Sequence, residues 1–172
     1  LAVTCLAIHS QTAQASSAAE LDRDSKAVLE KVIASNPGAR ALAKEARAIL
    51  VFPRIVKGGF VFGGQFGDGA LREGGRAKGY YRSIAASYGL QAGLQQFGYA
   101  LFFMNDGALK YLDSSAGFEL GVGPSIVVVD EGMAKSITST TLSQDVYAFI
   151  FSQKGLMAGI GLQGSKITRI SK

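Results

Sequence analysis

The sequence predicts an α+β fold in which N-terminal helices pack on a glycine-rich, mostly antiparallel, barrel-like β-sheet. Three observations predict this class. Apolar side chains recur at helical spacing in the first part of the chain, and short apolar runs separated by glycines follow them. The 172 residues also include 22 glycines without a strict period, which excludes a collagen-like repeat. Helices first and many short strands afterwards are typical of one α+β domain.

Two helices are expected before the strands. Residues 16–34 place Leu21, Val28 and Val32 on one apolar stripe, with charged residues on the other faces. The sequence SNPG at 35–38 ends this helix, because proline disfavours a helical residue before it and glycine tolerates positive φ. Apolar residues at 39, 42, 43 and 46 predict a second, alanine-rich helix. These stripes are expected to pack on the main domain, with an amphipathic helix on a membrane as the alternative.

Short apolar runs from residue 49 onward predict the strands. The expected turns are GDG at 67–69, REGGR at 72–76 and DEG at 130–132, and Asn105 is expected to cap one short helix, DGALKYL. Tyr80 and Tyr81 are expected to alternate between core and solvent. The strand candidates are residues 49–53, 58–66, 79–94, 98–104, 125–130, 145–151 and 156–170.

An export signal is expected at residues 1–15, leaving residues 16–172 as a single domain. The apolar run LAVTCLAI is followed by Ala13-Gln14-Ala15, which fits the small-x-small pattern before a signal peptidase cut. The alternative is lipoprotein processing at Cys5, with AVTC as the lipobox. The mature protein is therefore expected to be exported to the periplasm or cell envelope, either soluble or attached to a membrane.

Composition argues against most enzyme classes. The only cysteine, Cys5, and the only histidine, His9, both lie inside the predicted signal. The mature chain would then have no disulfide, no zinc site rich in Cys or His, no Cys nucleophile and no Ser-His-Asp triad. A hydrolase that uses carboxylates alone remains as an alternative. No catalytic residue, metal site or cofactor is predicted.

The sequence GIGLQG at 159–164 matches the G-x-G-x-x-G pattern of dinucleotide-binding turns. That chemistry requires a helix after the glycines and an acidic residue about 20 positions later. Only SKITRISK follows, which contains no acidic residue and is typical of a strand. We therefore interpret the match as accidental and assign the segment to a closing strand.

Positive charge is concentrated between residues 40 and 82. This region holds nine basic and three acidic side chains, whereas the whole chain has a formal net charge of +5. A cluster of this kind attracts anionic surfaces, and the alternative is a solvated face with scattered cations. Nucleic acid is not expected as a partner, since no motif of arginine and aromatic residues supports it.

Four segments carry a resemblance to a known family. They are ARAILVFPRIVKGGFVFGGQFGDGAL, GLQAG, VGPSIVVVDEGMAKS and DVYAFIFSQKGLMAGIGLQGSKI, in this order. From about Ser25 to Ile170 the chain resembles the bacterial branch of the SYLF domain family. The resemblance implies a non-enzymatic lipid-binding domain. The actin and phosphoinositide partners of eukaryotic members are not carried over to an exported protein.

Together these observations predict an exported domain that contacts anionic phospholipid membranes through a basic surface. The predicted lipid-binding residues come from the basic region, and they are Arg54, Lys57, Arg72, Arg76 and Lys78. Electrostatic attraction would act at long range and apolar insertion at short range. The alternative is a cell-envelope structural or protein-interaction module with no lipid ligand.

Overall fold

The computed structural model describes residues 16–59, 62–88, 93–114, 117–138, 142–152, 155–156, 162 and 164–172. The predicted signal peptide lies outside the described residues, as does most of the GIGLQG segment. Two helices open the described chain, α1 (Ala18–Ser35) and α2 (Pro37–Glu45). The remaining elements are β1 (Ala48–Gly59), β2 (Phe62–Glu73), β3 (Arg76–Tyr88), β4 (Gly93–Phe103), α3 (Asp106–Leu112), β5 (Phe118–Glu119), β6 (Ile126–Val128), α4 (Glu131–Ser136), β7 (Val146–Ser152), β8 (Gly155–Leu156) and β9 (Lys166–Ile170).

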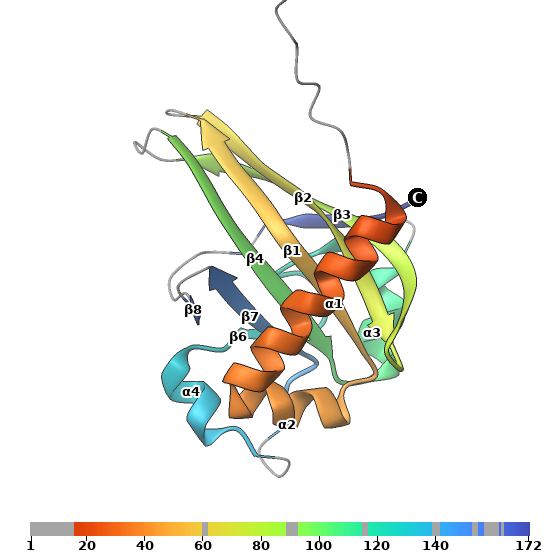
Figure 1. Cartoon of the computed structure of the whole chain (residues 1–172), viewed down its shortest axis with the longest axis vertical. Helices are drawn as coiled ribbons and strands as arrows, with labels where there is room; N and C mark the ends of the chain where they lie inside the picture. The colour runs from red at the N-terminus through yellow and green to blue at the C-terminus, as the bar shows by residue number, and fades with distance from the viewer. Residues whose placement is uncertain are drawn as a thin grey trace, which may run out of the picture.

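The described strands form one curled sheet under the N-terminal helices (Figure 1). Its order is β5-β9-β3-β2-β1-β4-β7-β6, and β8 pairs with β7. All of these pairs are antiparallel except β6–β7. The predicted α+β class with a mostly antiparallel, barrel-like sheet is therefore confirmed. No helix among the described residues is long and apolar enough to cross a membrane.

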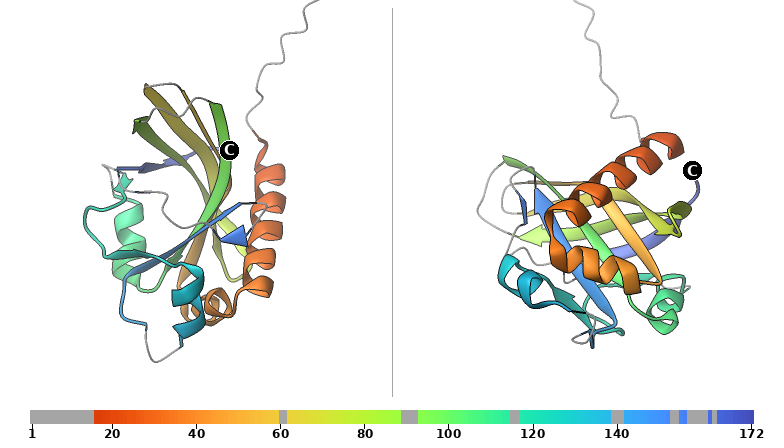
Figure 2. Two further views of the ribbon diagram at one scale, coloured as in Figure 1. Left: turned by 90° about the vertical axis from the view of Figure 1, so that its left-hand side faces the viewer. Right: turned by 60° about the horizontal axis from the view of Figure 1, so that its bottom comes forward.

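The sheet has an apolar core on each face. Leu50, Phe52 and Tyr99 belong to the core of the inner face, which Leu112 of α3 helps to close. Val51 belongs to the core of the outer face, the one that α1, α2 and α4 cover. Figure 2 shows α1 along the outer face and α3 on the opposite side of the curled sheet. The first half of β1 is buried on both faces of the sheet. Its sequence ILVFP is therefore apolar throughout and does not alternate with polar residues.

Glycines at 67 and 69 allow β2 to curl closely over β1. A Cβ at Gly67 would collide with the carbonyl oxygen of Arg54, and one at Gly69 would lie 2.7 Å from both the Phe52 ring and the Val51 carbonyl oxygen. The predicted GDG turn is wrong, because these residues lie in the middle of β2. Glycine marks close backbone approach here rather than a change of chain direction. The REGGR turn is confirmed, with positive φ at Gly74 and Gly75.

Side-chain caps fix the ends of the helices. Ser17 and Glu20 form a capping box at the start of α1, and Asn36 caps α2 with Pro37 following it. The predicted cap at Asn105 is confirmed, since its side chain accepts a hydrogen bond from the Ala108 N–H. The predicted DEG turn is wrong. Asp130 instead caps α4, where its carboxylate accepts from the Met133 N–H.

Some strand boundaries also differ from the prediction. The run at 58–66 is divided between β1 and β2, and the run at 79–94 is divided between β3 and β4. Tyrosine alternation is confirmed, because Tyr81 is fully buried while Tyr80 is partly exposed. In the run at 156–170, β9 begins only at Lys166, after a turn in which Gly164 has a φ of 80°.

Candidate functional site

The five predicted lipid-binding residues do not gather in one patch. Lys57 pairs with Gln65 across β1 and β2, whereas Arg76 pairs with Glu73 at the other end of β2. At about 3.3 Å per residue, this part of β2 spans roughly 26 Å. Arg54 and Lys57 therefore lie far from Arg76 and Lys78, and only Arg54, Arg76 and Lys78 are well exposed. Lys57 is half-buried on the inner face.

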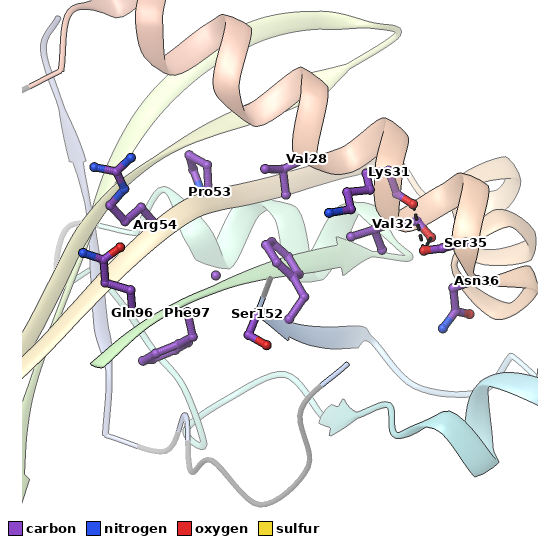
Figure 3. Close-up of a pocket in the computed structure, with 12 residues that line it drawn as sticks. Val28, Lys31, Val32, Ser35, Asn36, Pro53, Arg54, Gln96, Phe97 and Ser152 are labelled. Atoms are coloured by element: carbon purple, nitrogen blue, oxygen red, sulfur yellow. Dashed lines mark hydrogen bonds between the residues drawn. The ribbon is translucent and has the colours of Figure 1, made fainter. Parts of the chain in front are cut away.

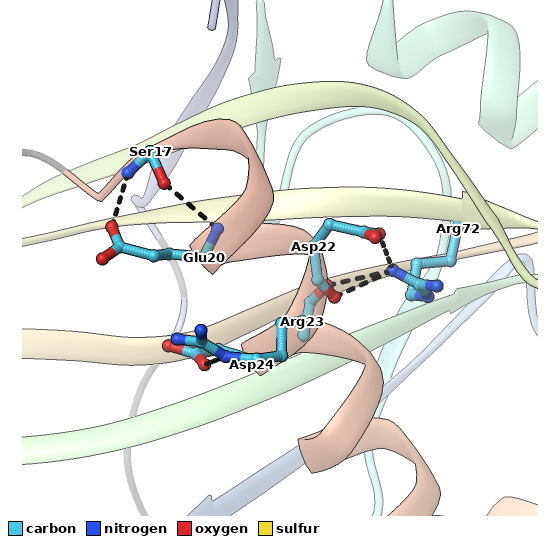
Figure 4. Close-up of polar contacts among 7 residues, drawn as sticks. Ser17, Glu20, Asp22, Arg23, Asp24 and Arg72 are labelled. Carbon is cyan, nitrogen blue, oxygen red and sulfur yellow. Dashed lines mark hydrogen bonds and ion pairs between the residues drawn. The ribbon is translucent and has the colours of Figure 1, made fainter.

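Arg72 lies under α1 and is not part of a basic surface. Its side chain is only 5% exposed, and its guanidinium donates to the Asp22 carboxylate, the Asp22 carbonyl, the Ser25 hydroxyl and the Gly75 carbonyl. Figure 4 shows Asp22 on α1 reaching Arg72 on the sheet. In this structure α1 therefore buries the charge of Arg72, which sequence position alone leaves exposed.

An exposed apolar pair lies on the outer face beyond α1. Cross-strand pairing aligns one row of side chains across six strands, and its members are Gln96, Val56, Phe66, Ile84, Lys166 and Glu119. In this outer row Phe66 is 58% and Ile84 is 53% exposed, so two large apolar side chains face solvent next to each other. A contiguous exposed apolar patch is more informative than scattered ones, since it often marks an interaction surface.

A charge cluster lies next to the outer row. Arg82 donates one hydrogen bond to each Asp68 oxygen, at 2.7 Å to Oδ1 and 3.0 Å to Oδ2, and Lys172 Nζ lies 2.9 Å from Oδ2. Burial alone would raise the pKa of Asp68, but the hydrogen bonds from Arg82 and Lys172 outweigh it and hold the pKa below its usual value. Arg82 and Lys172 thus share a single carboxylate, which offsets one of their two positive charges and engages both side chains.

The lowered pKa of Asp68 predicts a loss of stability in acid. Because the folded-state pKa lies below the unfolded value of 3.8, the contribution is present above that value and is lost as pH falls through the folded pKa. Asp68→Asn is expected to cost about 1 kcal/mol near neutral pH, and this difference from the wild type should shrink as pH falls below 3.8. Urea unfolding across this range measures it. A difference that stays constant with pH would contradict this role.

A groove of about 280 Å³ lies between α1 and the outer face of the sheet. Val28 and Val32 line it from α1, and Pro53 and Phe151 line it from the strands. Gly98 lines the groove without a side chain that would fill it. A Cβ there would lie 2.8 Å from the Phe52 carbonyl oxygen and would collide with the Phe151 ring. Gln96 belongs both to this groove and to the outer row. The two features therefore adjoin on one face.

Two cations flank the groove. Figure 3 shows Arg54 of β1 and Lys31 of α1 on either side of Pro53 and Val28. Neither cation forms an ion pair or a side-chain hydrogen bond with any residue that the structure describes. No acidic residue occurs among those found to line the groove. The groove thus combines apolar walls with uncompensated positive charge.

Sequence reasoning found Arg54 but missed Lys31, Phe66, Ile84 and Lys166. The missing information is the register, which brings residues 18 and 82 positions apart in the chain into one row. Strand alternation in β2 predicts part of this arrangement. Phe66 and Asp68 are two positions apart, so both side chains lie on the outer face. No group of three or more potential metal ligands occurs in the described part of the chain.

A family model described as Las17-binding protein actin regulator (Ysc84) matches residues 84–172. The chain belongs to the Ysc84 family. This result confirms the resemblance to the SYLF domain, for which Ysc84 is the family model, and the match covers just over half of the chain. Ysc84 is not an enzyme family. A comparison with curated proteins found no match.

The Ysc84 match starts within β3 and continues to the last residue of β9 and beyond. It therefore includes Ile84 and Lys166 of the outer row, together with the β4 and β7 walls of the groove. Helix α1 and strands β1 and β2, which supply Lys31, Arg54 and Phe66, precede the matched segment. The candidate site thus combines residues from both parts of the chain.

Proposed function

We propose that this member of the Ysc84 family is an exported lipid-binding domain that attaches to anionic phospholipid membranes of the cell envelope. The observation that carries the proposal is the exposed pair Phe66 and Ile84, with Lys166 and Arg54 on the same face. Neither cation forms an ion pair with a residue that the structure describes, although Glu119 lies opposite Lys166 in the strand register. In an anionic membrane, charged headgroups lie at the surface and hydrocarbon lies beneath them. The cations would contact the headgroups, and the apolar pair would enter the hydrocarbon.

The two kinds of side chain would act at different ranges. Each cation near an anionic bilayer contributes about 1 kcal/mol, and this attraction weakens with salt. Phe66 and Ile84 are already partly buried by their neighbours, so inserting the remainder of each would contribute roughly 1–2 kcal/mol. Neither contribution alone gives firm attachment. Together they predict reversible, salt-sensitive binding.

Vesicle co-sedimentation tests the proposal and compares two pairs of cations at opposite ends of the sheet. The variant Arg54→Gln/Lys166→Gln removes two charges next to the apolar pair and is expected to weaken binding to phosphatidylglycerol-containing vesicles about 30-fold at low salt. Arg76→Gln/Lys78→Gln removes the same charge at the far end of the β2–β3 pair and serves as the matched variant. Lys57→Gln, on the half-buried inner position, completes the series.

Equal losses for the two double variants would show that the predicted residues Arg76 and Lys78 contribute as much as the outer face does. Equal binding to phosphatidylcholine and phosphatidylglycerol vesicles, unaffected by salt, would contradict the electrostatic mechanism. Absence of vesicle binding, together with one stoichiometric protein captured by crosslinking, would support the protein-interaction alternative instead.

A further inference from the structure

We propose that the groove between α1 and the outer face of the sheet binds one single-chain anionic amphiphile, such as a fatty carboxylate. Its hydrocarbon chain would lie against Val28, Pro53 and Phe151, and its anionic head would lie between Lys31 and Arg54. The choice of lipid as the ligand class rests on the proposed function. The site itself does not require a membrane.

The size of the groove selects a single chain. Its volume of about 280 Å³ lies just below the roughly 300–1,000 Å³ of pockets that enclose drug-sized ligands. A two-chain phospholipid is too large for this space, whereas one hydrocarbon chain can lie along it. The walls come from α1, β1, β4 and β7, so the groove is built from regular elements rather than from loops alone.

Polar groups at the α2 end of the groove already have partners. The Ser35 hydroxyl donates to the Lys31 carbonyl at 2.8 Å, and the Asn36 side chain accepts from the Ala39 N–H at 3.1 Å. A ligand is therefore not needed to satisfy these groups. The Lys31 and Arg54 side chains differ, because they have no ion pair or hydrogen bond among the described residues and no lining carboxylate opposes them.

This charge pattern specifies the head of the ligand. An anionic head between two cations gains charge-assisted contacts, whereas a neutral alcohol of the same chain length gains only the apolar burial. Laurate is thus expected to bind about tenfold more tightly than dodecanol. The preference is expected to disappear in Lys31→Gln/Arg54→Gln.

The chain contains no tryptophan, so an introduced tryptophan reports on one position alone. Phe151→Trp places the reporter in the groove, and Tyr80→Trp places a control on β3 outside it. Brominated laurate is expected to quench the fluorescence of Phe151→Trp and not that of Tyr80→Trp. Circular dichroism establishes that both variants are folded, and native mass spectrometry of the wild-type protein counts bound laurate directly.

A second pair of variants tests the space itself. Val28→Trp is expected to fill the groove and abolish laurate binding, whereas Ala27→Trp, one residue away on an exposed face of α1, is expected to leave it unchanged. Equal affinities for laurate and dodecanol, equal quenching at positions 151 and 80, or an unaffected Val28→Trp variant would each overturn the inference.

These measurements contain no vesicles, so the two proposals fail separately. Laurate binding without vesicle binding would leave the groove site intact and overturn the membrane proposal. Vesicle binding without laurate binding would leave the membrane proposal intact and overturn the groove site.

Discussion

Replacing Gly67 with alanine is expected to destabilise the protein by roughly 3 kcal/mol. The new Cβ would collide with the carbonyl oxygen of Arg54 and would lie 2.7 Å from Cδ1 of Ile55. A flexible side chain could move away, but the carbonyl belongs to the backbone of β1, which is held between β2 and β4. The sheet would have to flatten locally, which would disturb the inner core that Ile55 shares with Phe97.

Gly64→Ala is the matched control for this prediction. It makes the same substitution three residues earlier on β2, where the new Cβ would meet only the Ala85 carbonyl oxygen at an ordinary 3.7 Å. This variant is expected to be as stable as the wild type or more stable by about 0.5 kcal/mol, since alanine costs less backbone entropy than glycine in a strand. Urea unfolding of both variants measures the difference. Similar stabilities for both would contradict the account of the curled sheet.

Asp22→Ala is expected to cost roughly 3 kcal/mol. The Arg72 guanidinium is only 5% exposed and would lose its carboxylate partner while remaining buried beneath α1. A buried cation without its counter-charge costs 3–5 kcal/mol in typical cases, and the 45% exposure of Asp22 reduces this expectation. The hydrogen bonds from Arg72 to the Ser25 hydroxyl and the Gly75 carbonyl would remain.

The double variant Asp22→Ala/Arg72→Met tests that explanation. Removing the buried charge as well as its partner should recover most of the stability. Loss of one partner leaves an uncompensated buried charge, whereas replacing both partners with apolar residues leaves none. The double variant is expected to lie within about 1 kcal/mol of the wild type. A double variant as unstable as Asp22→Ala would show that the loss arises from α1 packing and not from the unpaired cation.

The sequence predicted the order of the elements because local signals determine it. Leu21 and Val32 repeat at helical spacing, Pro37 and Asn105 mark helix starts, and Gly74 and Gly75 form a turn with positive φ. Each of these signals acts within a few residues. The errors at GDG and DEG have a shared cause, since glycine and aspartate are also used for close strand approach and for helix capping.

The candidate site was less predictable because it depends on register and burial. Charge density along the chain placed Arg72 in the same class as Arg54, but Arg72 is covered by α1 whereas Arg54 is exposed. The pairing of Phe66 with Ile84 and of Ile84 with Lys166 depends on long-range strand contacts. No local pattern in the sequence encodes these contacts. A count of charges along the chain therefore predicts an anionic ligand but does not predict which residues lie together.

The central claim is that the outer row of the sheet enters an anionic membrane, and a single tryptophan at position 66 tests it most directly. Since the chain has no tryptophan of its own, Phe66→Trp can be compared with Tyr80→Trp in vesicles of phosphatidylcholine and phosphatidylglycerol with brominated acyl chains. We expect strong quenching and a blue shift at position 66 only, both reversed by high salt. Bound protein in which the two positions are quenched equally, or in which position 66 is not quenched, would contradict the claim.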